Sequence, residues 1–106
     1  MDYTVKLSPK AHNDIKEIYE YVLKDGENIA KKQADAIYNS LERLSVFPFS
    51  GKSLEKYVSQ PTDYKFIVIN KLYIVFYKVE GESVEVVRIL RGERDYLNEL
   101  NLAKSK

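Results

Sequence analysis

The segment Tyr64–Leu90, with the sequence YKFIVINKLYIVFYKVEGESVEVVRIL, decides the fold of this chain. It contains three mainly apolar runs, which cover residues 64–70, 72–79 and 83–90. The connections Asn70-Lys71 and Glu80-Gly81-Glu82 have the length of hairpin loops, which favours antiparallel pairing of consecutive strands. The middle run is apolar on both faces, and this predicts a strand in the interior of the sheet.

Two amphipathic helices are predicted before these strands. Ser8 and Pro9 place an N-cap hydroxyl before a proline at the first helical position. Asp25-Gly26 ends this helix, and a second helix runs from Glu27 or Asn28 to about Leu44, before the loop FPFSG. Small residues early in the second helix let the two helices form a close antiparallel hairpin. The predicted buried faces are Ala11, Ile15, Ile18, Tyr19 and Val22 in the first helix, and Ala30, Ala34, Ile37, Leu41 and Leu44 in the second.

The remaining segments complete an α+β fold. Residues 3–7 alternate between apolar and polar side chains, so they form a strand that could pair at one side of the other three. A short C-terminal helix is possible beyond Glu93. The element order is therefore β-α-α-β-β-β with a possible C-terminal helix, and the helical hairpin covers one face of a small, mainly antiparallel sheet. The other face is expected to be partly open. Residues 1–106 form a single domain, because a chain of this length has no room for a second core.

Composition excludes several kinds of function. With 17 basic and 16 acidic residues, the net charge of +1 gives no general argument for nucleic-acid binding. The absence of cysteine and the single histidine, His12, argue against a thiol nucleophile and a metal site, and no cofactor is expected. The first residues do not resemble a signal peptide, and no apolar run is long enough for a membrane span, so we expect a cytoplasmic protein. Asp14, Glu17 and Glu42 are interpreted as acidic residues on solvated helix faces.

Cations gather where the last strand ends. Arg88, Arg91 and Arg94 lie within seven residues, and Tyr96 follows. Arg88 is in phase with the apolar residues Val84, Val86 and Leu90, so it must either reach the edge of the sheet or meet a carboxylate or a phosphate. Together with Lys65 and Lys71, these residues could bind phosphates and stack on bases. The alternative is that Arg94 pairs with Asp95 or Glu99 and that the other cations keep a sheet edge soluble.

Three segments resemble the RelE/ParE superfamily of toxins, which are the toxic halves of bacterial type II toxin–antitoxin modules. They are VKLSPKAHNDIKEIYEYV, LERLSVFPFSG and YKFIVINKLYIVFYKVEGESVEVVRILRGERDY, at residues 5–22, 41–51 and 64–96. The last one ends in the strand and arginine-rich turn that are typical of the superfamily. The resemblance covers roughly residues 3–100, and the fold that it implies agrees with the predicted element order.

The resemblance implies one of two mechanisms. RelE-like members are ribosome-dependent mRNA endonucleases, in which basic residues and usually a tyrosine drive attack of a ribose 2′-hydroxyl on the adjacent phosphate. ParE-like members lack that set and poison DNA gyrase. Lys65 matches one RelE-like lysine, but Ile67, Ile74 and Gly92 stand where such enzymes have cations. Because this loss removes much of the electrostatic stabilisation of a cleaved phosphate, a ParE-like toxin is favoured. The alternative is an unusual mRNA endoribonuclease that uses Lys65, Arg88, Arg91, Arg94 and Tyr96, although Tyr96 lies two residues before the position of the family's tyrosine.

The resemblance also implies partners. A cognate antitoxin would wrap the toxin with a C-terminal segment that folds on binding. The residues expected to contact the antitoxin or the target are Arg88, Arg91, Arg94 and Lys71. The target would be DNA gyrase, or the translating ribosome with its mRNA. A hypothesis of another class is a non-toxic binding module or a degenerate toxin that keeps the fold.

Overall fold

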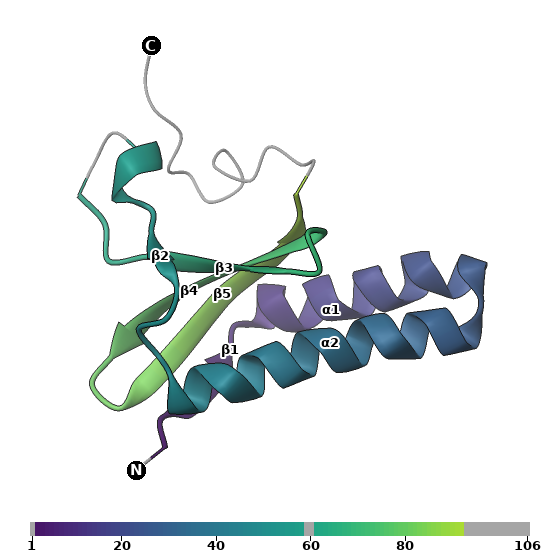
Figure 1. The fold of residues 1–106 in the computed structure, drawn as a ribbon, viewed down its shortest axis with the longest axis horizontal. Helices are drawn as coiled ribbons and strands as arrows, with labels where there is room; N and C mark the ends of the chain where they lie inside the picture. Colours follow the sequence, from purple (N-terminus) through teal and green to yellow (C-terminus); the bar gives the residue numbers. More distant parts are fainter. Residues whose placement is uncertain (1, 59–60, 93–106) are drawn as a thin grey trace.

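The computed structural model describes residues 2–58 and 61–92, and Figure 1 shows the chain as a ribbon. Two helices lie side by side against one face of a five-stranded sheet, and their connected ends extend beyond the strands. Short 3-10 helices cover Leu23–Asp25 and Glu55–Tyr57. The other elements are β1 (Thr4–Leu7), α1 (Pro9–Val22), α2 (Glu27–Val46), β2 (Lys52–Ser53), β3 (Lys65–Ile69), β4 (Tyr73–Glu80) and β5 (Ser83–Arg91).

The sheet confirms the predicted strand arrangement and makes it more specific. Its strand order is β1-β5-β4-β3-β2, so β4 lies in the interior, as its two apolar faces predict. The pairs β2–β3, β3–β4 and β4–β5 are antiparallel, whereas β1 pairs with β5 in parallel. The first strand, β1, therefore forms one edge of the sheet, next to β5. The predicted C-terminal helix lies outside the described residues.

The two helices begin and end for identifiable local reasons. The Ser8 hydroxyl accepts a hydrogen bond from the Ala11 amide at 3.0 Å, which confirms the predicted N-cap of α1. Gly26 separates the helices at a φ of 123°, which side-chain-bearing residues rarely adopt. The second helix extends to Val46, two residues beyond the predicted end, because Phe47 is the residue before Pro48 and cannot stay helical.

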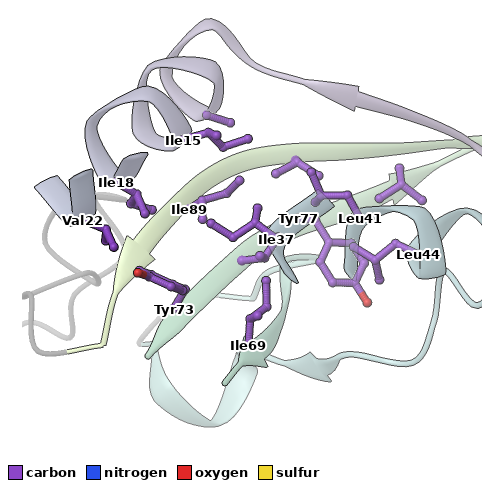
Figure 2. Close-up of a cluster of buried hydrophobic side chains, with 14 of the residues drawn as sticks. Ile15, Ile18, Val22, Ile37, Leu41, Leu44, Ile69, Tyr73, Tyr77 and Ile89 are labelled. Atoms are coloured by element: carbon purple, nitrogen blue, oxygen red, sulfur yellow. The ribbon is translucent and has the colours of Figure 1, made fainter. Parts of the chain in front are cut away.

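The main core lies between the helical hairpin and the sheet. Figure 2 shows Ile15, Ile18 and Val22 of α1 and Ile37, Leu41 and Leu44 of α2 pointing towards the sheet residues Ile69, Tyr73, Tyr77 and Ile89. The prediction that Tyr73 and Tyr77 are core residues is confirmed, since both are buried. Tyr19 was wrongly placed on the buried face of α1; it is 37% exposed. Tyr19 lies at the margin of the buried face, which Ile15, Ile18 and Val22 form.

A β-bulge in β5 changes the face of the sheet towards which its later side chains point. The register breaks between Phe76 and Tyr77, so that Phe76 is opposite Arg88 and Tyr77 is opposite Val86. One extra residue, Val87, therefore stands on β5 at this point, and the alternation of its side chains shifts. This makes the predicted phase wrong beyond Val86: Ile89 joins the main core, and Leu90 joins a second cluster with Leu54 and Phe76.

The second cluster changes the expectation of an open sheet face. Leu54, Phe76 and Leu90 are each at most 1% exposed. Partly buried side chains surround them, namely Tyr64, Phe66, Ile74 and Val87. The centre of this face is consequently closed, and the prediction that it is partly open does not hold there.

The β3–β4 turn carries backbone strain. Asn70 and Lys71 have φ values of 52° and 61°, and the Leu72 amide donates to the Ile69 carbonyl at 2.9 Å. Positive φ at both central residues is the type I′ pattern, for which Asn-Gly is the preferred pair.

We expect Lys71→Gly to stabilise the protein by about 0.5–1 kcal/mol, because glycine adopts this conformation without a steric penalty. Urea unfolding at neutral pH measures the change. Lys32→Gly, in the middle of α2, is the opposite control and should destabilise the protein by about 1 kcal/mol. A lower stability of Lys71→Gly than of the wild type would contradict the assignment of strain to this turn.

Candidate functional site

The end of β5 brings two of the predicted cationic residues to the same end of the sheet. Arg91 is opposite Tyr73, the first residue of β4. The Gly92 amide donates to the Leu72 carbonyl at 2.8 Å, which ties the end of β5 to the β3–β4 turn that carries Lys71. We define Lys71 and Arg91 together as the cationic end of the sheet.

The Arg91 guanidinium stacks on an aromatic ring of the first helix. Its central carbon lies 4.5 Å from the centroid of the Tyr21 ring, within the range of a cation–π contact. A small cavity of about 210 Å³ opens beside this pair, and Glu17 and Ile18 line its helical side. The sequence did not pair Tyr21 with Arg91, because 70 residues separate them and only the docking of α1 on β5 brings them together.

Arg88 has a structural partner in Asp14. Its Nε and Nη2 atoms donate to Asp14 Oδ2 and Oδ1, both at 2.8 Å, in a bidentate ion pair. The Ile89 amide also donates to Asp14 Oδ2 at 2.9 Å. The interpretation of Asp14 as a solvated residue is wrong, since it is only 4% exposed. The sequence left open whether Arg88 reaches the edge of the sheet or binds a carboxylate or a phosphate. In the structure it binds the carboxylate of Asp14.

Asp14 also satisfies a backbone group at the outer edge of β5. β1 pairs with β5 only as far as Val86, so the outer edge of β5 has no neighbouring strand beyond that residue in the described chain. Side chains of the α1 segment replace the missing strand: the Ser8 hydroxyl donates to the Val87 carbonyl at 2.8 Å, and Asp14 accepts from Ile89. Backbone groups at the edge are thereby satisfied, and α1 is held against the end of β5.

The remaining predicted site residues do not join this end. Lys65 is opposite Tyr77 on β4, whereas Arg91 is opposite Tyr73. These two positions on β4 are four residues apart, which corresponds to roughly 13 Å along a strand. Ile67 packs against the main core and Ile74 against the second cluster. Arg94 and Tyr96, both candidate site residues, lie outside the described residues.

Tyr77 is buried but keeps a hydrogen bond for its phenol. The Gly51 amide donates to its oxygen at 2.9 Å. A Cβ atom at position 51 would lie 2.8 Å from the Phe66 carbonyl oxygen, so only glycine allows this close approach. Burial raises the pKa of the Tyr77 phenol above its usual value of 10.0, although the hydrogen bonds with Gly51 and Ser50 act in the opposite direction.

We expect Tyr77→Phe to lower the free energy of unfolding by about 1–3 kcal/mol near neutral pH, because the Gly51 amide loses its acceptor. With a raised folded-state pKa, the contribution of the phenol is fully present below pH 10.0 and is lost as the pH rises through the folded-state value. In urea unfolding, the difference in the free energy of unfolding between the wild type and the variant should therefore be constant well below pH 10.0 and narrow as the pH rises above 10.0. A difference that widens over this interval would contradict the assignment.

A groove that the sequence did not predict lies on the opposite edge of the sheet. It has a volume of about 570 Å³ and runs between the end of α2 and β3. Its lining includes Arg43, Leu44, Phe47, Lys52, Phe66 and Val68. In the sequence, the residues around Phe47 were interpreted only as the break after α2. Nothing local to that segment signals that Phe47 remains 61% exposed beside β3.

Two negative findings apply to residues 2–58 and 61–92. Neither helix in these ranges has the length and apolar character needed to cross a bilayer. No group of three or more His, Cys, Asp or Glu side chains in them is arranged to hold a metal ion.

Comparison with solved structures shows that the fold occurs in another protein chain. A chain from a structure described as the chromosomal ParDE TA system from P. aeruginosa matches with a TM-score of 0.72 and 20% sequence identity, over 86% of this chain and 97% of that one. The helical hairpin on a mixed sheet is thus a fold that this chain shares with that one. A search of curated proteins gives no match.

The amino-acid sequence shows the family to which the chain belongs. The family described as the ParE toxin of the type II toxin–antitoxin system, parDE, matches residues 5–96, which is most of the chain. This protein belongs to the ParE toxin family. Its partner is accordingly a cognate antitoxin.

Proposed function

We propose that this ParE-family toxin arrests bacterial growth by inhibiting DNA gyrase, and that its cationic end, Lys71 and Arg91, contacts the target. The observation that carries this choice of target is the placement of the residues that would cleave RNA. The β4 partners of Lys65 and Arg91 lie four residues apart. Two of the three positions where this chain lacks the cations of RelE-like enzymes are occupied by Ile67 and Ile74, which pack against the hydrophobic clusters.

Cleavage of mRNA needs cations that converge on one phosphate and a proton donor beside it. Of the five candidates for such a reaction, Arg88 is engaged by Asp14, and Lys65 lies apart from Arg91. An isoleucine provides neither charge nor a proton. Inhibition of a protein target requires only a complementary surface, and the cationic end provides one without any catalytic group.

Inducing the protein alone in bacteria tests this proposal. We expect growth arrest with intact messages and with loss of negative supercoiling in a reporter plasmid. New mRNA 5′ ends at fixed positions within translated codons, mapped by primer extension, would instead establish ribosome-dependent cleavage. Continued growth at a high level of folded protein would favour the non-toxic binding module.

A further inference from the structure

We infer that Tyr21 is a positioning residue of the target contact: its ring holds the Arg91 guanidinium in the orientation in which the edge of that group binds a carboxylate of gyrase. The inference rests on the proposed function, since it takes gyrase as the target and Arg91 as a contact residue. It adds a residue of the first helix to the cationic end of the sheet. Three observations lead to it.

The first observation is the exposure of the Tyr21 ring. Tyr21 is 53% exposed, whereas Ile18 and Val22 beside it on α1 are 7% and 8% exposed and belong to the core. The ring packs instead against a charged group, since the central carbon of Arg91 lies 4.5 Å from its centroid. An arginine side chain has several rotatable bonds, and stacking on an aromatic face restricts them before a partner binds. The ring therefore lowers the entropy cost of binding through Arg91.

The second observation is that the ring and the guanidinium lie on elements that are fixed to each other. Tyr21 follows Asp14 by seven residues, which is two helical turns along the same face of α1, or about 10 Å. Asp14 accepts a hydrogen bond from the Ile89 amide at 2.9 Å, and Ile89 is two residues before Arg91 on β5. The stack thus forms between two rigid elements that Asp14 joins, and binding groups on rigid elements keep their geometry.

The third observation is the chemistry of the pair. A guanidinium that stacks through its face has its N–H donors around its edge, and the planar fork that they form matches a carboxylate. Lys24, in the short helix that follows α1, has its ammonium nitrogen 5.6 Å from the centroid of the same ring. Two cations from different elements therefore gather around Tyr21, and an acidic side chain of a protein target would be attracted to both.

Two carboxylates line the cavity beside the stack, those of Asp14 and Glu17. Asp14 is engaged by Arg88 in the bidentate ion pair, and Glu17 accepts a hydrogen bond from the Asn13 side chain at 3.0 Å. Since Arg88 balances the charge of Asp14, Glu17 alone opposes the two cations at the ring. The surface around Tyr21 consequently favours an acidic partner.

The affinity of purified gyrase for the immobilised full-length toxin, measured by surface plasmon resonance, tests the assignment. We expect Tyr21→Leu to weaken binding about 5-fold through loss of the cation–π contact, whereas Tyr21→Phe keeps the aromatic face and should stay within about 2-fold of the wild type. Arg91→Lys keeps the charge without the fork and should weaken binding at least about 5-fold. Tyr38→Leu on α2 is the matched control, because Tyr38 is 51% exposed, and it should change affinity by less than about 2-fold. Thermal unfolding verifies that each variant is folded.

Two further readouts distinguish a positioning role from a direct contact or a structural one. In the Arg91→Ala background, Tyr21→Leu should change affinity by less than about 2-fold, because the ring acts through the guanidinium. In NMR spectra of the free toxin, the Arg91 Hε resonance should move downfield in Tyr21→Leu, which removes the ring current above which it lies. It should stay near its wild-type position in Tyr21→Phe and Tyr38→Leu. A loss of stability alone would produce neither result.

Wild-type affinity of Tyr21→Leu or of Arg91→Lys would overturn the inference and leave gyrase as the target. A further loss of affinity on Tyr21→Leu in the Arg91→Ala background would also overturn it, since Tyr21 would then contact gyrase itself. Binding of the toxin to DNA without gyrase, with the same dependence on Arg91, would replace the carboxylate by a phosphate and contradict the assignment. If the wild-type toxin does not bind gyrase at all, the proposed function fails and the inference fails with it.

Discussion

Asp14→Ala is expected to destabilise this toxin by about 3–5 kcal/mol, because it leaves the Arg88 guanidinium without its carboxylate in a largely buried site. The Ile89 amide loses its acceptor in the same change. A domain of this size has a total stability of about 5–15 kcal/mol, so the change removes a large share of that stability. Equilibrium urea unfolding with circular dichroism measures the effect.

The matched control for this prediction is Glu20→Ala, which removes an exposed carboxylate from the same helix and should change stability by less than about 0.5 kcal/mol. A double-mutant cycle with Arg88→Ala should give a large coupling energy, because the two side chains form a bidentate ion pair. If Asp14→Ala costs less than about 1 kcal/mol, then the pair does not hold α1 to the end of β5.

This pair also alters how toxicity data on Arg88 should be interpreted. Loss of growth arrest on Arg88→Ala would follow from unfolding alone, since Asp14 would remain buried and, among the described residues, would keep the Ile89 amide as its hydrogen-bond donor. Arg88 was predicted as a contact residue, and that prediction can be examined only with a substitution whose folded state has been verified. Lys71 and Arg91 are better tests of the target surface.

The second large effect is expected for the double variant Lys71→Ala and Arg91→Ala. Truncation of a central interface arginine typically costs about 2 kcal/mol or more, so affinity for gyrase should fall by roughly 30-fold or more. Growth arrest on induction should weaken in parallel. Lys32→Ala, on an exposed position of α2, removes a charge elsewhere and should leave both properties unchanged.

The stacking of Arg91 on Tyr21 contributes about 0.5–1 kcal/mol at a partly exposed site, and thermal unfolding verifies that the double variant is folded. Colony counts after induction and a pull-down of gyrase measure the outcome. Full toxicity of the folded double variant would mean that the target contact lies elsewhere on the toxin.

The parts of the fold that could be predicted depend on local patterns. The Ser8-Pro9 start of α1 and the apolar faces of β4 produce their structural effects within a few residues, so periodicity is sufficient to locate them. The end of α2 was misplaced by two residues because the helix continues until the constraint from Pro48 acts on Phe47.

The parts that could not be predicted depend on contacts between distant segments. The bulge at Val87 shifts the alternation of β5, and only its pairing with β4 reveals it. Asp14 looks like any polar residue on α1 until the edge of β5 is placed beside it, 75 positions along the chain from Ile89. The groove likewise arises from the packing of α2 against β3, and neither element carries a motif for it.

The central claim is that this toxin acts on gyrase and not on mRNA. The most direct measurement is a DNA supercoiling assay with purified gyrase, relaxed plasmid and increasing amounts of purified toxin. We predict that the wild type blocks supercoiling, that the folded Lys71 and Arg91 double variant does so only at much higher concentration, and that added antitoxin restores the reaction. Unimpaired supercoiling in the presence of a toxin that arrests growth would contradict the account.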